Sequence, residues 1–383
     1  MVRHASPHMA GDEAKSGETL KKILLVLNCM MLAIGTTCGP LIMRLYFTRG
    51  GNRIWLSGWL QTAGWPIITI PLAVSYVHRH HRSSAATTSS TGTSSSSVPR
   101  PVQMKAPLFV ASAAVGVLTG FDDYLYAYGV AHLPVSTASL IVATQLAFTA
   151  GFAFIFVKQR LTPYSINSVF LLTLAAAVLA LHTGSDKPEG ESKREYAMGF
   201  VMTVAAAVLY GFILPLVELS YMKAKQIITY SLVLEYQLVM CFFATAVCTV
   251  GMLINNDFQE IPIEAKMYGM GELKYYVVVV WNAVIWQFSF LGTIGVIFCS
   301  SSLTSGVIMT VLLPATELLA VIFFKEKFQV EKGISLTLSL WGFVSYFYGE
   351  MSLHQNHQPP PPADNGNARP LCQIECTSVM KII

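Results

Sequence analysis

Residues 301–324 read SSLTSGVIMTVLLPATELLAVIFF, an apolar run in which Glu317 is the one charged residue. About 20 such residues in a helix span the roughly 30 Å hydrocarbon core of a bilayer. Pro314 lies in the middle of the run, and membrane bundles tolerate proline where neighbouring groups satisfy the freed carbonyl. The run therefore predicts a membrane-spanning helix.

The rest of the chain repeats this pattern. The composition agrees, because 53% of the residues are hydrophobic and 12% are charged, whereas soluble domains carry about 25% charged residues. The net charge of +4 is spread over many loops and indicates no nucleic-acid binding. We predict an all-α membrane protein in the lipid bilayer with ten transmembrane helices, at Leu24–Tyr46, Ile54–Val77, Pro107–Ala131, Pro134–Val157, Tyr164–His182, Tyr196–Leu219, Ser231–Ile254, Tyr275–Cys299, Ser301–Phe324 and Glu331–Gly349.

The segments between the predicted spans are mostly short. Placing the N-terminus in the cytoplasm leaves 14 Lys and Arg residues on that side and 11 on the other, which favours cytoplasmic termini. The composition of the Ser/Thr-rich loop 83–99 and of the C-terminal tail predicts that both are disordered. The predicted organisation is an N-terminal tail (1–21), a first five-helix half (22–182), a loop (183–195), a second five-helix half (196–350) and a C-terminal tail (351–383).

An internal repeat relates the fourth and ninth predicted spans. Shifting Pro134–Thr162 by 167 residues onto Ser301–Gln329 gives eight identities in 29 positions. Each segment includes the fourth span of a five-span half. Because five is odd, the two halves must face the membrane in opposite directions. Inverted repeats of this kind are typical of secondary transporters, whose substrate sites lie near the membrane midplane between the halves.

Polar and aromatic side chains within the spans are the functional candidates, because polar groups are costly in hydrocarbon. Amides or carboxylates beside large aromatic rings suit a flat, hydrogen-bonding heterocycle, since the ring can stack while the polar groups bond its edge. The candidates are Trp59 in the second span, Asp122, Tyr124 and Tyr128 in the third, Gln145 in the fourth, Glu235 in the seventh, Asn282 and Trp286 in the eighth, and Glu317 in the ninth.

Structural alternatives exist for several of these residues. Tyr124 and Tyr128 can be packing residues, Glu235 lies close enough to the end of its span to be solvated, and Glu317 can join helices by an internal hydrogen bond. No Lys or Arg lies near the centre of any predicted span, which argues against a phosphorylated or strongly anionic solute. The cavity should hold neutral or cationic solutes. With no CxxC, metal-ligand cluster or nucleophile motif in the sequence, we expect neither a metal site nor an enzyme.

Six stretches resemble the plant purine permeases, a branch of the drug/metabolite transporter superfamily. They are residues 34–46 (IGTTCGPLIMRLY), 118–148 (LTGFDDYLYAYGVAHLPVSTASLIVATQLAF), 200–219, 290–306, 313–324 (LPATELLAVIFF) and 340–350. The resemblance covers nearly all of residues 22–350. The family usually has Asn where this chain has Asp123, a departure that changes the charge at this position.

The resemblance implies two inverted five-helix halves with cytoplasmic termini, most often in the plasma membrane. It implies uptake of adenine and of cytokinins such as trans-zeatin, driven by a proton gradient and without another cofactor. The alternatives are a transporter of other heterocycles or alkaloids and a nucleotide-sugar or phosphometabolite carrier. The oligomeric state, monomer or homodimer, is left open. The expected roles are hydrogen bonding to the base by Gln145, Asn282 and Glu235, stacking by Trp59, Tyr124 and Trp286 with Tyr128 nearby, and proton exchange by Asp122, Glu235 or Glu317.

Overall fold

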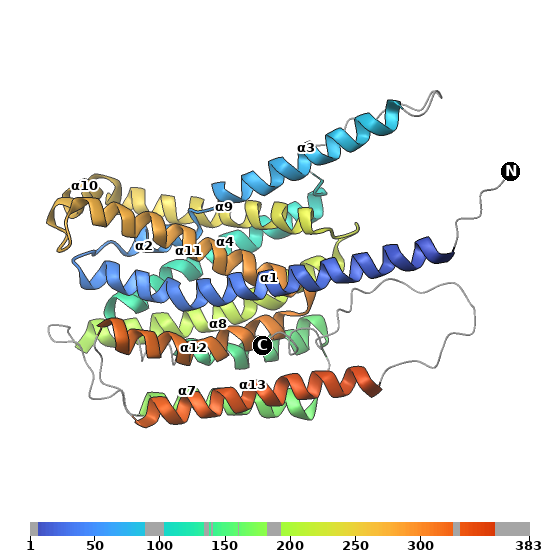
Figure 1. The fold of residues 1–383 in the computed structure, drawn as a ribbon. Helices are drawn as coiled ribbons and strands as arrows, with labels where there is room; N and C mark the ends of the chain where they lie inside the picture. The colour runs from blue at the N-terminus through green and yellow to red at the C-terminus, as the bar shows by residue number, and fades with distance from the viewer. Residues whose placement is uncertain are drawn as a thin grey trace.

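The computed structural model describes residues 7–88, 103–133, 138, 141–159, 161–181, 193–324 and 330–356. Within these ranges every regular element is a helix, and most of the helices run along one common axis (Figure 1). They are α1 (Pro7–Thr48), α2 (Ile54–Thr62), α3 (Pro66–Thr88), α4 (Ala106–His132), α6 (Gln145–Phe152), the π-helix η1 (Ala153–Val157), α7 (Pro163–Leu181), α8 (Lys193–Lys223), α9 (Tyr230–Ile254), α10 (Asp257–Met267), α11 (Glu272–Cys299), α12 (Ser302–Phe324) and α13 (Val330–Asn356).

Seven helical segments are long and apolar enough to cross a membrane. They match seven of the predicted spans to within four residues at each end. The prediction of an all-α, multi-pass membrane protein is therefore confirmed. The seven segments are Lys22–Thr48, Ile54–Val77, Ala106–His132, Lys193–Lys223, Tyr230–Ile254, Glu272–Cys299 and Ser302–Phe324.

The other three predicted spans coincide with helices outside this set of seven. The fourth is covered by α6 and η1, and its residues 134–137, 139 and 140 lie outside the described residues. The fifth and tenth coincide with α7 and α13. The described apolar parts of the fourth and fifth, Ile141–Val157 and Pro163–Ala175, are short. The count of ten spans in two repeats therefore stays a prediction.

Helix α3 and helix α13 both run beyond the ends of their predicted spans. The backbone is helical to Thr88, so α3 includes the first residues of the loop predicted to be disordered. Likewise, α13 extends to Asn356 and takes in the first residues of the predicted C-terminal tail. The remaining parts of those two segments, 89–99 and 357–383, lie outside the described residues.

The second predicted span is broken into α2 and α3 by a turn at residues 63–65. Pro66 follows this turn as the first residue of α3. Proline has no backbone N–H to continue the ladder of the preceding helix, and it is favoured at a helix start. The break leaves Gln61 and Thr62, both buried, at the end of α2 in the interior of the bundle.

Helices α1 and α11 pack in close contact through small residues. A Cβ atom at Gly35 would overlap the backbone of Ser289, and one at Gly292 would overlap the backbone of Leu32. Small residues let helix backbones approach closely in membranes. Since Gly35 meets Ser289 while Gly39 meets the earlier residue Trp286, the two helices are antiparallel.

Helix α4 lies between α8 and α9 and packs against both. The Gly116–Gly120 pair of α4 faces the Met240 and Ala244 carbonyls of α9, so α4 and α9 are parallel. Against α8 the order reverses, because Gly129 meets Thr203 whereas the later residue His132 meets Gly199. Helices α4 and α8 are therefore antiparallel.

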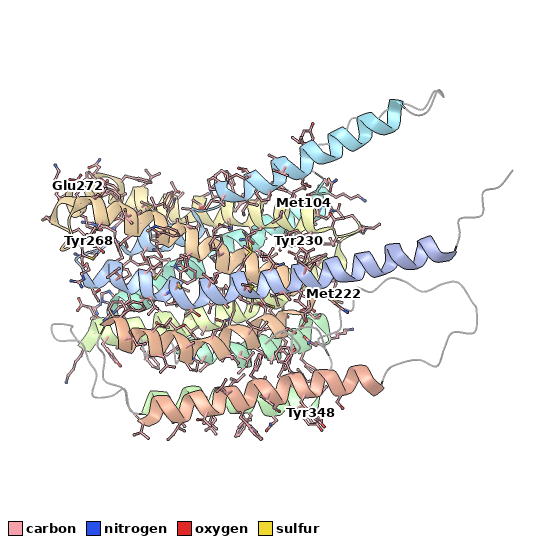
Figure 2. All side chains as sticks on the ribbon, viewed as in Figure 1. Met104, Met222, Tyr230, Tyr268, Glu272 and Tyr348 are labelled. Atoms are coloured by element: carbon pink, nitrogen blue, oxygen red, sulfur yellow. The ribbon has the colours of Figure 1, made fainter. Side chains whose placement is uncertain are left out.

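The two ends of the bundle carry different elements. Figure 2 shows Tyr268 and Glu272 at the end that carries α10, and Met104, Met222 and Tyr230 at the opposite end. Helices α7 and α13 form an antiparallel pair at one edge of the bundle, with Tyr348 on α13 (Figures 1 and 2). The end of the bundle with Tyr268 and Glu272 is called the α10 end, and the end with Met104 is called the Met104 end.

Helix α10 was not predicted, and a network of polar contacts holds it to the turn between α1 and α2. Arg53 in that turn lies 3.0 Å from Glu260, 3.7 Å from Asp257 and 3.7 Å from Glu264 (nearest N–O distances). The Glu264 carboxylate also accepts hydrogen bonds from the hydroxyls of Tyr46 (2.5 Å) and Tyr275 (3.1 Å). This α10 network joins α1, α2 and α11 at one end of the bundle.

Candidate functional site

A cavity lies inside the bundle where α1, α2, α4, α6, α8, α11 and α12 meet. It contains about 750 Å³ of space not filled by atoms, counting the part open to solvent. Binding cavities for small molecules commonly combine an apolar wall with a few polar groups. The polar and aromatic residues of this wall are Thr36, Gln61, Asp122, Asp123, Tyr126, Gln145, Tyr210, Trp286, Ser289, Phe290 and Thr310.

Two adjacent carboxyl groups stand out in this wall. Asp122 and Asp123 follow one another in α4 and are 6% and 1% exposed. Asp122 Oδ1 and both Asp123 carboxyl oxygens lack a hydrogen-bond partner among the described residues. The described wall contains no Lys, Arg or His. A buried carboxylate without a cation is costly in a membrane, so this site favours a ligand that donates hydrogen bonds, carries positive charge or supplies a proton.

Amide groups stand beside the carboxyl groups. Gln61 Nε2 donates to the backbone carbonyl of Asp123 (2.9 Å), which fixes α2 against α4. Gln145 lies at the first turn of α6, and its Nε2 makes a long contact of 3.9 Å with the sulfur of Met309. Because an amide has both donors and an acceptor, Gln145 can bond a heterocycle that presents either kind of group.

Aromatic rings form another part of the wall. Trp286 on α11 and Tyr126 on α4 meet edge to face, with ring centroids 5.6 Å apart. The indole Nε1 of Trp286 has no partner among the described residues. Tyr210 reaches the cavity from α8. A planar solute could stack on these rings while its edge meets the amide and carboxyl groups.

Prolines interrupt two of the helices that line the cavity. Pro40 in α1 and Pro314 in α12 have no N–H to give to the carbonyls of Thr36 and Thr310, four residues earlier. Both threonines line the cavity. Membrane proteins tolerate such interruptions where protein groups or a polar cavity satisfy the freed carbonyls.

The structure brings three of the sequence-predicted residues to the cavity: Asp122, Gln145 and Trp286. Asn282 lies one helical turn before Trp286 and is fully buried. Neither atom of its amide has a partner among the described residues. Asn282 therefore stands next to the cavity wall without being part of it.

The remaining predicted residues lie elsewhere. Glu235 is at the Met104 end, where Oε2 accepts from the backbone N–H groups of Gln103 (2.9 Å) and Met104 (3.0 Å) ahead of α4. The side chain of Glu317 is outside the described residues. The aromatic residues are engaged with neighbours: Trp59 Nε1 donates to Thr249 Oγ1 (3.0 Å), Tyr124 stacks on Trp55 (centroids 3.9 Å apart), and Tyr128 is tilted against Tyr124 (6.3 Å).

The cavity wall also includes Thr36, Tyr210 and Thr310, which were not identified as candidates from the sequence. Single hydroxyl groups are common in apolar helices and rarely attract attention by themselves. A usable signal was present for the two threonines, since each stands four residues before a proline within a predicted span. No comparable signal marks Tyr210.

The bundle and its cavity together define a multi-pass membrane protein with a polar binding site among its helices. The sequence profile of a family described as "Purine nucleobase transmembrane transport" matches residues 23–356. The chain belongs to the purine permease family.

Three relatives from Arabidopsis thaliana illustrate the similarity. "Purine permease 3" is 56% identical over 330 residues, covering 86% of this chain and 91% of that protein. "Purine permease 2" is 54% identical over 343 residues, covering 87% and 93%. "Probable purine permease 5" is 34% identical over 336 residues, covering 88% of each chain. The relatives are named as permeases, so the expectation of a transporter rather than an enzyme is confirmed.

Proposed function

We propose that this chain is a proton-coupled permease for purine bases such as adenine and for purine-derived cytokinins such as trans-zeatin. It takes them up across the plasma membrane by alternating access. The observation that carries the proposal is the cavity itself, where a carboxyl pair, amides and aromatic rings meet in a member of the purine permease family.

The base binds with its ring against Trp286 and its edge toward Gln145 and Asp122. Adenine has ring nitrogens that accept hydrogen bonds and an amino group that donates them. The Gln145 amide can complement both, and the Asp122 carboxyl can accept from the amino group. Stacking of a base on an aromatic side chain contributes about 1–3 kcal/mol. Asn282 supports the Trp286 side of the wall from the preceding turn.

Asp122 is the proposed proton carrier. It lies in the cavity near Tyr126 and Tyr210, and the described part of the wall has no cation to balance its charge. Binding a proton removes an uncompensated charge before the carrier reorients through the membrane. Glu317 stays a candidate for the same role. For Glu235 we propose that its bonds to the backbone ahead of α4 place it at a gate rather than at the base.

The proposed architecture is ten spans in two inverted halves. Arg44, near the end of α1, donates to the Val130 and Leu133 carbonyls at the end of α4, so α1 and α4 run in the same direction. Since α8 is antiparallel to α4, the first spans of the two halves run in opposite directions. An inverted repeat relates the first span (α1) to the sixth (α8) and the third span (α4) to the eighth (α11), so the α1–α11 pair corresponds to the α8–α4 pair. Both pairs are antiparallel and closely packed.

With the termini in the cytoplasm, the α10 end faces the outside of the cell. The α10 network then lies where the first and second spans meet in the extracellular space. Glu235 and the start of α4 lie at the cytoplasmic end.

A phosphorylated substrate is disfavoured, because none of the described residues of the cavity wall is Lys or Arg. A cationic alkaloid is chemically compatible with the two carboxyl groups.

Uptake of radiolabelled adenine into yeast that lack their own purine carrier tests the proposal. We expect uptake that a protonophore abolishes and that excess trans-zeatin competes away. Uptake that persists with the protonophore would contradict proton coupling. A protein present at the cell surface that takes up a cationic alkaloid and no adenine would contradict the purine assignment.

A further inference from the structure

A second polar cluster lies behind the cavity, between α2, α4, α9 and α11. It consists of Asp123, Gln237, Cys241 and Gln287. Gln237 and Gln287 are fully buried, and Gln237 Nε2 donates to Cys241 Sγ (3.0 Å). The Gln287 side chain lies beside the same thiol, and Asp123 is close enough to interact with it electrostatically. Asp123 also lines the cavity, so it joins the two polar regions.

The polar atoms of this cluster are poorly satisfied. Both carboxyl oxygens of Asp123, the amide oxygen of Gln237 and both amide atoms of Gln287 are buried without a hydrogen-bond partner among the described residues. Native proteins contain few such atoms, and each is usually explained by water, an ion or a functional role. Here they gather around the Cys241 thiol, within electrostatic reach of the Asp123 carboxyl, which points to a site that takes up a proton together with water.

We propose that Asp123, supported by the amides of Gln237 and Gln287, is a second proton-binding group, so that each purine base enters with two protons. This inference rests on the proposed proton-coupled uptake and specifies its stoichiometry. A proton from water outside the cell binds the Asp123 carboxylate and neutralises it. On the cytoplasmic side the O–H bond breaks, water takes the proton, and the carboxylate is restored.

The groups around Asp123 explain why its charge needs a proton. Asp122 precedes it on α4, Cys241 and Cys248 face it from α9, and Tyr210 lies near it from α8. From α2 the Gln61 amide donates to its backbone carbonyl, and the described cavity wall holds no cation. Two adjacent carboxylates repel each other, so the pair takes up protons in two coupled steps. Asp122 contacts the base, whereas Asp123 adjoins the amide cluster.

The proton count can be measured as an equilibrium accumulation ratio. The purified full-length protein is reconstituted into vesicles whose interior is one pH unit more alkaline than the bath, with the membrane potential held at zero. Each coupled proton then multiplies the accumulation of neutral labelled adenine about tenfold. We expect about 100-fold accumulation by the unmodified protein and about 10-fold by Asp123→Asn, which keeps the shape of the side chain without a titratable group.

A matched control comes from the α7–α13 pair. Asn167→Leu removes an amide that bonds Ser345 on the exposed side of the bundle, and it should keep the accumulation of about 100-fold. Asp123→Glu keeps a carboxyl group and should accumulate more adenine than Asp123→Asn. All variants are compared at equal amounts of monodisperse protein.

Several results would overturn the inference. About 10-fold accumulation by the unmodified protein, measured without any variant, would mean one proton per base. An unchanged ratio in Asp123→Asn would mean that Asp123 carries none, and a folded Asp123→Asn protein that transports nothing would make Asp123 essential instead of additional. If the unmodified protein shows no accumulation under the pH gradient, the proposed proton coupling itself fails, which separates the two claims.

Discussion

The carboxyl groups of this protein occur in two contrasting settings. At the α10 end, Asp257, Glu260 and Glu264 surround the guanidinium of Arg53 at 3.0–3.7 Å. In the middle of the bundle, Asp122 and Asp123 have no such cation among the described residues of the cavity wall. The first group is paired with a cation of the protein and holds α10 in place, whereas the second has no described cation to pair with and is the one proposed to bind a proton or solute. The predictions below test this difference.

The largest effect is expected for Asp122→Asn. Asparagine keeps the size of the side chain but cannot release and rebind a proton, so uphill uptake should fall at least about 100-fold, in the range found for loss of an essential proton-transfer group. Labelled adenine uptake in yeast, divided by the amount of protein at the cell surface, measures this. Uptake within a few fold of the unmodified protein would remove Asp122 from the coupling site.

Trp286→Ala should weaken binding of the base and leave the protein intact. Loss of about 1–3 kcal/mol of stacking corresponds to a rise in KM of about 5- to 150-fold. Trp281→Ala is the control, since this tryptophan belongs to the same helix but is 55% exposed on its outer surface. Equal effects of the two substitutions on KM would show that Trp286 does not contact the base.

Tyr275→Phe tests the α10 network as a structural element. It removes one hydroxyl that bonds the Glu264 carboxylate, and hydrogen bonds to charged groups contribute about 1.5–3 kcal/mol. The variant should unfold at a lower temperature in detergent, while adenine uptake per folded molecule stays unchanged. Tyr276→Phe, at a position 41% exposed, should change neither property. A stable Tyr275→Phe protein with lost uptake would assign the network a role in transport.

The smallest effect is expected for the contribution of Asp257 to the pH dependence of thermal stability. Burial raises the pKa of this carboxyl, against the opposing effects of the Asn255 hydrogen bond and the Arg53 charge. The folded protein thus binds this proton more tightly than the unfolded chain, so the contribution to stability is present at low pH and is lost as pH rises through the raised pKa. The unmodified protein should therefore gain thermal stability relative to Asp257→Asn when the buffer is acidified from neutral. A constant difference between the two proteins over that pH range would contradict this.

Much of the bundle could be predicted from the sequence because bilayer-length apolar runs leave little choice of structure. The seventh predicted span, for example, differs from α9 by one residue at its start. Helix α10 could not be predicted in this way. It is short and contains Pro262 and several charged residues. It is held by Arg53 and the Tyr46 hydroxyl of α1, which are remote in sequence, and by the Tyr275 hydroxyl of α11.

The cavity could be predicted only in part. Asp122, Gln145 and Trp286 were recognisable because polar or amphipathic groups are rare deep within apolar runs. The same criterion selected Glu235, whose carboxylate instead accepts backbone N–H groups at the end of its span. Residue type and spacing show that a side chain is polar, but the identity of the helix it faces depends on packing, which places Tyr210 in the cavity and Tyr124 on Trp55.

The most direct test of the account is proton movement upon addition of adenine to vesicles that contain the purified protein. A weakly buffered external solution should become more alkaline as unmodified protein carries labelled adenine inward, and Asp122→Asn should abolish this change while Trp281→Ala and Tyr275→Phe retain it. Adenine-dependent alkalinisation by Asp122→Asn equal to that of the unmodified protein would contradict the claim that the unpartnered carboxyl of the cavity couples protons to purine transport.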